Sequence, residues 1–216
     1  MSSTVRLKIT EIFHSLQGEA QFAGLPTVFV RLTGCPLRCH YCDTAYAFHG
    51  GEWWSLEQVL ARVAELRAHD VCVTGGEPLA QRDCAALLRA LCDAGYRVSL
   101  ETSGALPVEG IDARVIRVVD VKTPGSGEES RNLYPQLQSL QSQDQIKFVI
   151  TTRADYEWSR AKLAELALGR NCGVLFSPSY GQLEPRLLAE WILADHLPVR
   201  FQMQLHKLLW GEERGR

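Results

Sequence analysis

Three cysteines in the first quarter of the chain have a spacing that could hold a metal centre. Cys35, Cys39 and Cys42 lie within eight residues and form the pattern C-x-x-x-C-x-x-C. A short loop can turn three thiolates toward one soft metal, and only a metal makes their combined negative charge tolerable. A structural zinc site normally closes with four ligands, whereas three cysteines suit a cubane iron–sulfur cluster whose fourth iron stays free for a ligand.

Two other interpretations of this segment stay open from the residues alone. His40 could complete a zinc site, although its position directly after Cys39 would strain the chelate. The three thiols could also be chemically inert. The four remaining cysteines lie in apolar stretches, and we expect them to pack in the core: Cys72, Cys84, Cys92 and Cys172.

A second motif, Gly75-Gly76-Glu77-Pro78, follows a short β-rich run. Paired glycines let a backbone pass close to a ligand, and a carboxylate accepts hydrogen bonds from an ammonium group. On its own, the same sequence is equally typical of a turn. The motif therefore adds to the cysteine pattern without carrying a function by itself.

The segments that must position these residues alternate between β-rich runs and amphipathic helical patterns. This alternation predicts an α/β fold with a mainly parallel sheet, which keeps its chemistry in loops at the carboxyl ends of the strands. We expect strands at residues 7–13, 27–33, 71–74, 97–101, 115–121, 145–151, 173–176 and 199–202. We expect helices at residues 55–67, 81–94, 154–168 and 185–194, the first of which opens with a capping-box pattern at Ser55-Leu56-Glu57-Gln58. Residues 123–132, rich in glycine and glutamate, predict a mobile loop.

Length and composition restrict the class of protein further. With 216 residues, 46% of them hydrophobic and 22% charged, the chain is typical of one soluble globular domain, residues 1–216. A net charge of −2 and the lack of a basic stripe argue against direct nucleic-acid binding. No apolar run reaches the roughly 20 residues of a spanning helix, and the N-terminal residues show no signal peptide. We therefore expect a cytoplasmic protein with no membrane contact.

The cysteine loop resembles the radical S-adenosylmethionine superfamily, whose signature is C-x-x-x-C-x-φ-C with an aromatic residue, here Tyr41, before the last cysteine. The Gly-Gly-Glu sequence resembles the motif with which that superfamily holds the amino group of S-adenosylmethionine. The resemblance implies one [4Fe–4S] cluster on the three cysteines, with S-adenosylmethionine chelating the open iron and yielding a 5′-deoxyadenosyl radical after one-electron cleavage. It also implies a single-domain partial α/β barrel, open on one side.

The other motifs resemble one branch of that superfamily, the 7-carboxy-7-deazaguanine synthases of queuosine biosynthesis. They lie at residues 9–19, 24–32, 42–44, 100–104 and 204–207, so the resemblance covers essentially the whole chain. It implies a lyase that abstracts a hydrogen atom from C6 of 6-carboxy-5,6,7,8-tetrahydropterin and contracts the ring to 7-carboxy-7-deazaguanine, with loss of ammonia. S-Adenosylmethionine is regenerated in each turnover, Mg²⁺ is required, and tRNA is modified only later in the pathway.

The resemblance nominates residues for each ligand. An amide and a carboxylate within residues 16–19 could bind the donor–acceptor edge of a pterin, and Arg31 could bind its carboxylate bidentately. The nominated substrate contacts are Leu16, Gln17, Gly18, Glu19, Arg31, Thr74 and His206, the last from a C-terminal strand. The nominated S-adenosylmethionine contacts are Tyr41, Cys42, Asp43, Gly76, Glu77, Ser103, Asp120, Val121, Lys122, Ser177, Pro178 and Ser179. Thr44 would offer its hydroxyl to Mg²⁺, a cation that prefers oxygen ligands.

Several nominations have a plain structural alternative. Gln17 could belong to a turn, Arg31 to a surface salt bridge and Thr44 to a helix cap, and a lone histidine such as His206 is more often packed than catalytic. Residues 120–122 and 177–179 also depart from the Ser-Pro-Lys and Gln-Pro-φ-Asp versions of other members. Members that end soon after the His-Lys pair place a terminal carboxylate near the substrate. This chain runs on, and we expect Glu212 to supply that carboxylate.

Partners follow from the resemblance alone: an external electron donor such as a flavodoxin, and a second copy of the chain in a homodimer. Two other functions stay in view. An activase that installs a glycyl radical on a partner protein would share the cysteine motif and cleave S-adenosylmethionine without responding to a pterin. A zinc-stabilised binding module would be colourless and would contain zinc but no iron.

Overall fold

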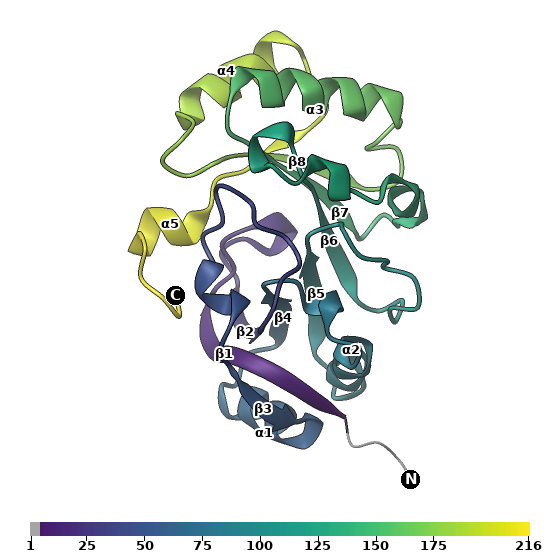
Figure 1. Ribbon diagram of the computed structural model, residues 1–216, viewed down its shortest axis with the longest axis vertical. Helices are drawn as coiled ribbons and strands as arrows, with labels where there is room; N and C mark the ends of the chain where they lie inside the picture. The colour runs from purple at the N-terminus through teal and green to yellow at the C-terminus, as the bar shows by residue number, and fades with distance from the viewer. Residues whose placement is uncertain (1–4) are drawn as a thin grey trace.

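A single curved sheet of nine strands runs through the part of the chain that the structure, a computed structural model, describes, residues 5–216 (Figure 1). The strands are β1 (Arg6–Leu16), β2 (Pro26–Leu32), β3 (Glu52–Ser55), β4 (Asp70–Gly75), β5 (Arg97–Thr102), β6 (Ile116–Val121), β7 (Gln145–Ile150), β8 (Gly173–Pro178) and β9 (Arg200–Phe201). Their spatial order is β3-β1-β2-β4-β5-β6-β7-β8-β9. Neighbours from β2 to β9 are parallel, whereas β1 pairs antiparallel with β2 and β3. The N-terminal residues 1–4, part of the segment for which we expect no signal peptide, lie outside the described range.

The helices lie in two pairs at the two ends of the sheet. Figure 1 shows α1 and α2 at the lower end, α3 and α4 across the upper end, and α5 to one side. Their bounds are α1 (Leu56–Glu65), α2 (Cys84–Asp93), α3 (Arg153–Glu165), α4 (Pro185–Ala194) and α5 (Leu205–Trp210). Short 3-10 helices occupy Ala20–Phe22, Ala45–Phe48, Pro78–Ala80, Pro124–Ser126, Glu129–Arg131 and Tyr134–Ser139. No helix within residues 5–216 is long and apolar enough to cross a membrane.

Each helix pair covers its own hydrophobic cluster. One cluster joins β1, β2, β4 and β5 to α1 and α2, with Leu88 and Leu91 among its fully buried members. The other joins β6, β7 and β8 to α3 and α4, where the rings of Phe148 and Phe176 meet edge-to-face with centroids 5.3 Å apart. The four scattered cysteines are buried and free, which confirms the prediction that they pack in the core.

Two helix starts show how side chains set the local structure. At α1, Ser55 Oγ accepts a hydrogen bond from the Gln58 backbone at 3.3 Å and the Gln58 side chain accepts one from the Ser55 backbone at 2.8 Å, the predicted capping box. At α2 the helix begins at Cys84, three residues later than expected. The Gln81 side chain instead bonds the Lys8 backbone N–H and carbonyl at 2.8 and 2.9 Å, which ties this loop to β1.

The sequence predicted the parallel strands well and missed two short elements. The strand β3 and the helix α5 were not expected, because four and six residues are too few to show a clear period. Residues 123–132, expected to form a mobile loop, fold into two 3-10 turns in which Thr123 and Ser126 are fully buried. The α/β class and the mainly parallel sheet are confirmed.

The sheet is an open barrel whose gap is bridged by the turn between β1 and β2. The edge strands β3 and β9 are not paired with each other within the described residues. Gln21, in the turn, donates its backbone N–H to Gln145 Oε1 of β7 at 2.9 Å. Gly18 accepts a hydrogen bond from the Leu205 backbone of α5 at 2.9 Å. The turn therefore connects the β1–β2 side of the sheet with β7 and α5.

We predict that Leu88→Ala lowers the free energy of unfolding by about 2–5 kcal/mol, because Leu88 is fully buried between α2 and the sheet. Leu193→Ala is the matched control, since this leucine of α4 is 72% exposed and its loss leaves no cavity. Urea unfolding of the metal-free protein measures both variants. Equal effects of the two substitutions would contradict the assignment of this core.

Candidate active site

A pocket of about 460 Å³ opens at the carboxyl ends of the parallel strands. Its walls include Arg31 from β2, Thr74 from β4, Glu101 from β5, Asp120 from β6 and Lys147 from β7. A parallel sheet brings the carboxyl ends of its strands to one edge, so residues far apart in the sequence face the same space. The pocket lies where the sequence placed the chemistry.

The pocket brings most of the nominated residues together. Those that line it are Leu16, Gln17, Gly18, Glu19, Arg31, Cys35, Cys39, Tyr41, Cys42, Asp43, Thr44, Thr74, Gly76, Ser103, Asp120, Lys122, Ser179 and His206. Glu77, Val121, Ser177 and Pro178 do not line it. Val121 belongs to the second hydrophobic cluster, and Pro178 faces a separate cavity of about 290 Å³ beside the loop that precedes α4.

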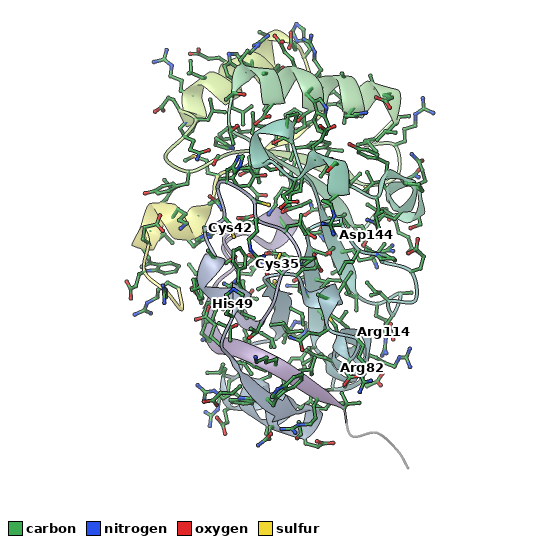
Figure 2. All side chains as sticks on the ribbon, viewed as in Figure 1. Cys35, Cys42, His49, Arg82, Arg114 and Asp144 are labelled. Carbon is green, nitrogen blue, oxygen red and sulfur yellow. The ribbon has the colours of Figure 1, made fainter. Side chains whose placement is uncertain are left out.

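The three clustered cysteines share one end of this pocket. Figure 2 labels Cys35 and Cys42 on the loop that follows β2, between the two halves of the sheet. Burial raises the pKa of Cys39 to about 11, with smaller contributions in the same direction from Asp120 and from the two other cysteines of the loop. Burial likewise raises the pKa of Cys35. Thiolates at this place therefore require a strong cation nearby, which is what a bound metal cluster provides.

Two further observations bear on whether a cluster and a ligand fit here. The phenolic oxygen of Tyr41 is buried and has no hydrogen-bond partner among the described residues, so this end of the pocket has a polar group to offer. Within residues 5–216, no three His, Cys, Asp or Glu side chains are already gathered as a metal site. The donor set suits the cluster, and its ligation by the three cysteines stays a prediction.

The glycine motif brings β4 against the cysteine loop. A Cβ atom at Gly76 would overlap the Gly34 carbonyl and lie 2.8 Å from Cys35 Cβ. The next backbone N–H, of Glu77, donates to the Gly34 carbonyl at 2.8 Å. The paired glycines therefore allow a close approach, but of one backbone segment to another.

The carboxylate of Glu77 is fully buried and already paired inside the protein. It accepts hydrogen bonds from Thr102 Oγ1 at 2.9 and 3.0 Å, from the Ser103 backbone at 2.6 Å and from the Leu79 backbone at 2.9 Å. These bonds tie the end of β4 to the end of β5. Glu77, which was nominated to bind the ammonium group of S-adenosylmethionine, therefore stabilises the fold in this structure.

Three side chains hold Arg31, which lies near the end of β2. Its Nε lies 2.7 Å from Glu11 Oε1, which also accepts a hydrogen bond from the Tyr46 hydroxyl at 2.7 Å. Its guanidinium lies 5.8 Å from the Phe13 ring centroid and 5.9 Å from that of Tyr46. Arg31 is more than a surface salt bridge, because it is mostly buried and lines the pocket.

A chain of buried charges forms the floor of the pocket. Lys147 Nζ pairs with Glu19 Oε2 and lies 3.2 Å from Asp120 Oδ1, and Lys122 Nζ lies 2.7 Å from Asp120 Oδ2. Gln204 donates to the other oxygen of Glu19 at 2.8 Å. Burial raises the pKa of Glu19, but the Lys147 charge and hydrogen bond outweigh it and leave that pKa below its usual value. Both carboxylates are therefore ionised.

Sequence reasoning missed two residues of this floor. Glu101 accepts hydrogen bonds from Gln17 Nε2 at 3.2 Å and Thr74 Oγ1 at 3.4 Å, and burial raises its pKa. Glu101 lies at the end of a strand and within the motif at residues 100–104, and this position could have identified it as a pocket residue. Lys147 was the harder case. Its sequence signal was a lysine within the apolar run that forms β7, because a charged side chain in a buried strand needs a partner.

Two predictions about the C-terminal segment can be compared with the structure. His206 lines the pocket as expected, but the prediction that it comes from a strand is wrong, because it lies in the first turn of α5. Its ring occupies the space where a side chain at Gly18 would stand. Burial lowers the pKa of His206. Glu212 also lines the pocket, with Oε2 at 2.9 Å from Lys207 Nζ.

Comparison with known proteins adds sequence and fold likeness to this geometry. The family model described as the radical SAM superfamily matches residues 29–119. The chain is 45% identical to the 7-carboxy-7-deazaguanine synthase of Chlorobaculum tepidum, over 99% of this chain and 98% of that protein. It is 40% identical to the enzyme of that name from Koribacter versatilis, over 96% of this chain and 98% of that protein.

Solved structures give the same picture. The crystal structure of QueE from Escherichia coli matches with a TM-score of 0.77 and 28% identity, over 93% of this chain and 95% of that chain. Streptococcus suis SuiB bound to S-adenosylmethionine matches with a TM-score of 0.53 and 14% identity, over 79% of this chain and 45% of that chain. The second likeness concerns the fold alone.

We predict that Glu77→Gln lowers the free energy of unfolding of the metal-free protein by about 1–3 kcal/mol. An amide nitrogen in place of Oε2 cannot accept the hydrogen bond from the Ser103 backbone, and in place of Oε1 it cannot accept the one from the Leu79 backbone. Urea unfolding tests this, with Glu190→Gln on the surface of α4 as the control. Unchanged stability in Glu77→Gln would show that the buried hydrogen bonds are not what requires the glutamate.

Proposed function

The chain belongs to the 7-carboxy-7-deazaguanine synthases, lyases of the radical S-adenosylmethionine superfamily, and from that premise we propose which residues bind the cofactors and which bind the substrate. The reaction converts 6-carboxy-5,6,7,8-tetrahydropterin to 7-carboxy-7-deazaguanine with release of ammonia, in queuosine biosynthesis. One observation carries the proposal: the three cysteines and the polar groups suited to a pterin line the same pocket.

We assign the cofactors to the cysteine end of the pocket. Cys35, Cys39 and Cys42 hold the [4Fe–4S] cluster, and when bound, the cluster and S-adenosylmethionine supply the one-electron chemistry that removes the hydrogen atom from C6. The methionine part of this cofactor carries an ammonium and a carboxylate, and Asp120 and Lys122 offer the complementary charges at 2.7 Å from each other. The other contacts assigned to it are Tyr41, Asp43, Gly76, Ser103 and Ser179. Glu77, Val121, Ser177 and Pro178 support the strand ends behind them.

We assign the pterin to the end formed by the β1–β2 turn. The amino group and a ring N–H of the pterin are hydrogen-bond donors, and an ionised Glu19 accepts their bonds. The Gln17 amide and Glu101 bind the rest of the same edge of the pterin ring. Arg31 pairs with the 6-carboxylate. Thr74 and His206 complete the wall, and Leu16 and Gly18 shape it. The residues keep water from the reacting carbon and fix its orientation.

Mg²⁺ is assigned to Thr44, which lines the pocket. The hydroxyl lies 3.8 Å from Cys42 Sγ, beside the cofactor end. Mg²⁺ keeps several waters and takes few protein ligands, which suits a single hydroxyl together with oxygens of the substrate.

The remaining proposals concern the surroundings of the enzyme. A flavodoxin-like electron donor would approach the cysteine loop, where Arg38 and His40 are exposed. All seven cysteines are free, which suits a reducing compartment such as the cytoplasm. A single domain, a homodimer and the absence of direct nucleic-acid or membrane contacts complete the proposal.

We predict that anaerobically reconstituted protein forms 7-carboxy-7-deazaguanine and ammonia from the pterin, S-adenosylmethionine, Mg²⁺ and a reductant, as mass detection would show. Cys39→Ala abolishes turnover because a cluster ligand is lost, whereas the core variant Cys172→Ala retains it. Cleavage of S-adenosylmethionine with the pterin untouched would favour the glycyl-radical activase. A colourless protein with zinc and no iron would favour the binding module.

We predict that Lys147→Met makes the KM for the pterin depend on pH. In the native protein Lys147 holds the pKa of Glu19 below its usual value, so Glu19 stays ionised at neutral pH. Without that charge, burial raises the pKa of Glu19. As the pH falls, the carboxylate takes up a proton and no longer accepts hydrogen bonds from the pterin. We expect KM to rise about tenfold for each unit of pH below the new pKa.

Steady-state kinetics between pH 6 and 9 measures this effect. Lys162→Met is the matched control, because this half-buried lysine of α3 is paired with Glu165 and does not line the pocket. The Lys147 charge also lowers the pKa of His206, Glu101 and Asp120, so the double variant Glu19→Gln/Lys147→Met, in which the extra pH dependence should be absent, assigns the effect to Glu19. A KM in Lys147→Met that changes with pH only as in the native enzyme would contradict the role given to Lys147.

A further inference from the structure

Residues 123–132, between β6 and β7, form a well-anchored segment that we call the platform. Thr123 Oγ1 donates to the Val149 carbonyl of β7 at 3.0 Å, and Ser126 Oγ donates to the Thr123 carbonyl at 2.6 Å. The Gly125 backbone donates to Asp155 Oδ1 of α3 at 2.8 Å. These bonds fasten both the strand side and the helix side of the platform to the rest of the protein.

The end of the platform is fastened as well. The Asn132 side chain accepts a hydrogen bond from the Lys122 backbone N–H and donates one to the Lys122 carbonyl, both at 2.8 Å. Asn132 thereby closes the platform into a loop whose two ends lie together. Side chain–backbone bonds of this kind hold a loop in one conformation.

The platform contacts the cysteine loop on both sides of Cys39. The His40 backbone N–H donates to the Ser126 carbonyl at 3.0 Å. The Arg38 backbone N–H donates to Glu128 Oε1, and the Glu128 backbone in turn donates to Ser126 Oγ at 3.0 Å. Cys39 therefore lies between two residues, Arg38 and His40, whose backbone N–H groups both donate hydrogen bonds to the platform.

Gly127 makes this contact possible. Its φ is +76°, and a Cβ atom there would lie 2.8 Å from His40 Cε1 and 2.9 Å from His40 Nε2. A side chain there would therefore displace the His40 ring from its place against the platform, next to Cys39.

We propose that the platform is a positioning element for the cluster site, which fixes Cys39 relative to Cys35 and Cys42 through Arg38, His40 and the space at Gly127. The inference rests on the proposed ligation of a cluster by these cysteines. Three ligands on one short loop bind a cluster tightly only if their backbone is already in place, and outer contacts that orient a ligand commonly change metal affinity by about 10–100-fold.

The test compares Gly127→Ala with Gly110→Ala. Both glycines have a positive φ, +76° and +81°, but nothing lies within 4 Å of a Cβ atom at Gly110. The control therefore carries the backbone strain without the clash. We expect Gly127→Ala, after reconstitution, to lose iron to a chelator about tenfold faster than the native protein, and to show an altered electron paramagnetic resonance spectrum of its reduced cluster. Gly110→Ala should match the native protein in both readouts.

A second pair of variants keeps the proposal testable if Gly127→Ala does not fold. Glu128→Ala removes the acceptor of the Arg38 backbone bond and should lose iron faster, whereas Glu128→Gln keeps an oxygen there and should behave as the native protein. Adding His40→Ala to Gly127→Ala removes the clashing ring and should restore iron retention.

Three outcomes separate this inference from the proposed function. Faster iron loss in Gly127→Ala and Glu128→Ala, with recovery in Gly127→Ala/His40→Ala and Glu128→Gln, supports the platform. Native iron retention in Gly127→Ala and Glu128→Ala overturns it and leaves the cluster assignment intact. Failure of the native protein to take up iron at all overturns the cluster assignment, and the platform inference with it.

Discussion

The buried ammonium of Lys147 is the constraint on which the pocket depends. A charge inside a protein must be neutralised there, and removing one partner of such a pair commonly costs about 3–5 kcal/mol. The two carboxylates that neutralise Lys147 come from opposite sides, Glu19 from the β1–β2 turn and Asp120 from the end of β6. Their pairing holds the turn across the open side of the sheet. The same contact closes the pocket, provides its floor and keeps Glu19 ionised.

The two ends of the pocket are built on different principles. The substrate end relies on charges held by other charges, as in Arg31 with Glu11 and Glu19 with Lys147. The cysteine end relies on backbone contacts, because the loop after β2 is pressed between the strand end at Gly76 and the platform at Gly127. A polar substrate needs fixed charges, whereas a cluster needs fixed thiols. The fold supplies each at the end that we assign to it.

The sequence predicted those parts of the structure that depend on local rules. The cysteine spacing, the capping box at Ser55 and the alternation of strands and helices each follow from residue type and period, and the structure contains them. The β1–β2 turn was also correctly linked to the pocket, since Gln17 and Glu19 line it. Most of the residues nominated from the family resemblance also line the pocket, because a family motif records tertiary contacts that a period cannot.

What the sequence missed depends on contacts between distant segments. Glu77 turns into the protein because Thr102 and Ser103, on another strand, offer it hydrogen bonds. Lys147 faces the pocket because a turn more than a hundred residues earlier brings Glu19 to it. Residues 123–132 are fixed because Asp155 of α3 and the cysteine loop hold them. No local pattern carries such information.

The most direct test of the central claim is the fate of the hydrogen at C6 of the pterin. If the two ends of the pocket hold S-adenosylmethionine and the substrate against each other as assigned, turnover of substrate deuterated at C6 will transfer deuterium to the S-adenosylmethionine that is recovered. Mass spectrometry of the recovered cofactor measures this. Formation of 7-carboxy-7-deazaguanine with no deuterium in the recovered S-adenosylmethionine would contradict the account, since C6 would then not face the cofactor.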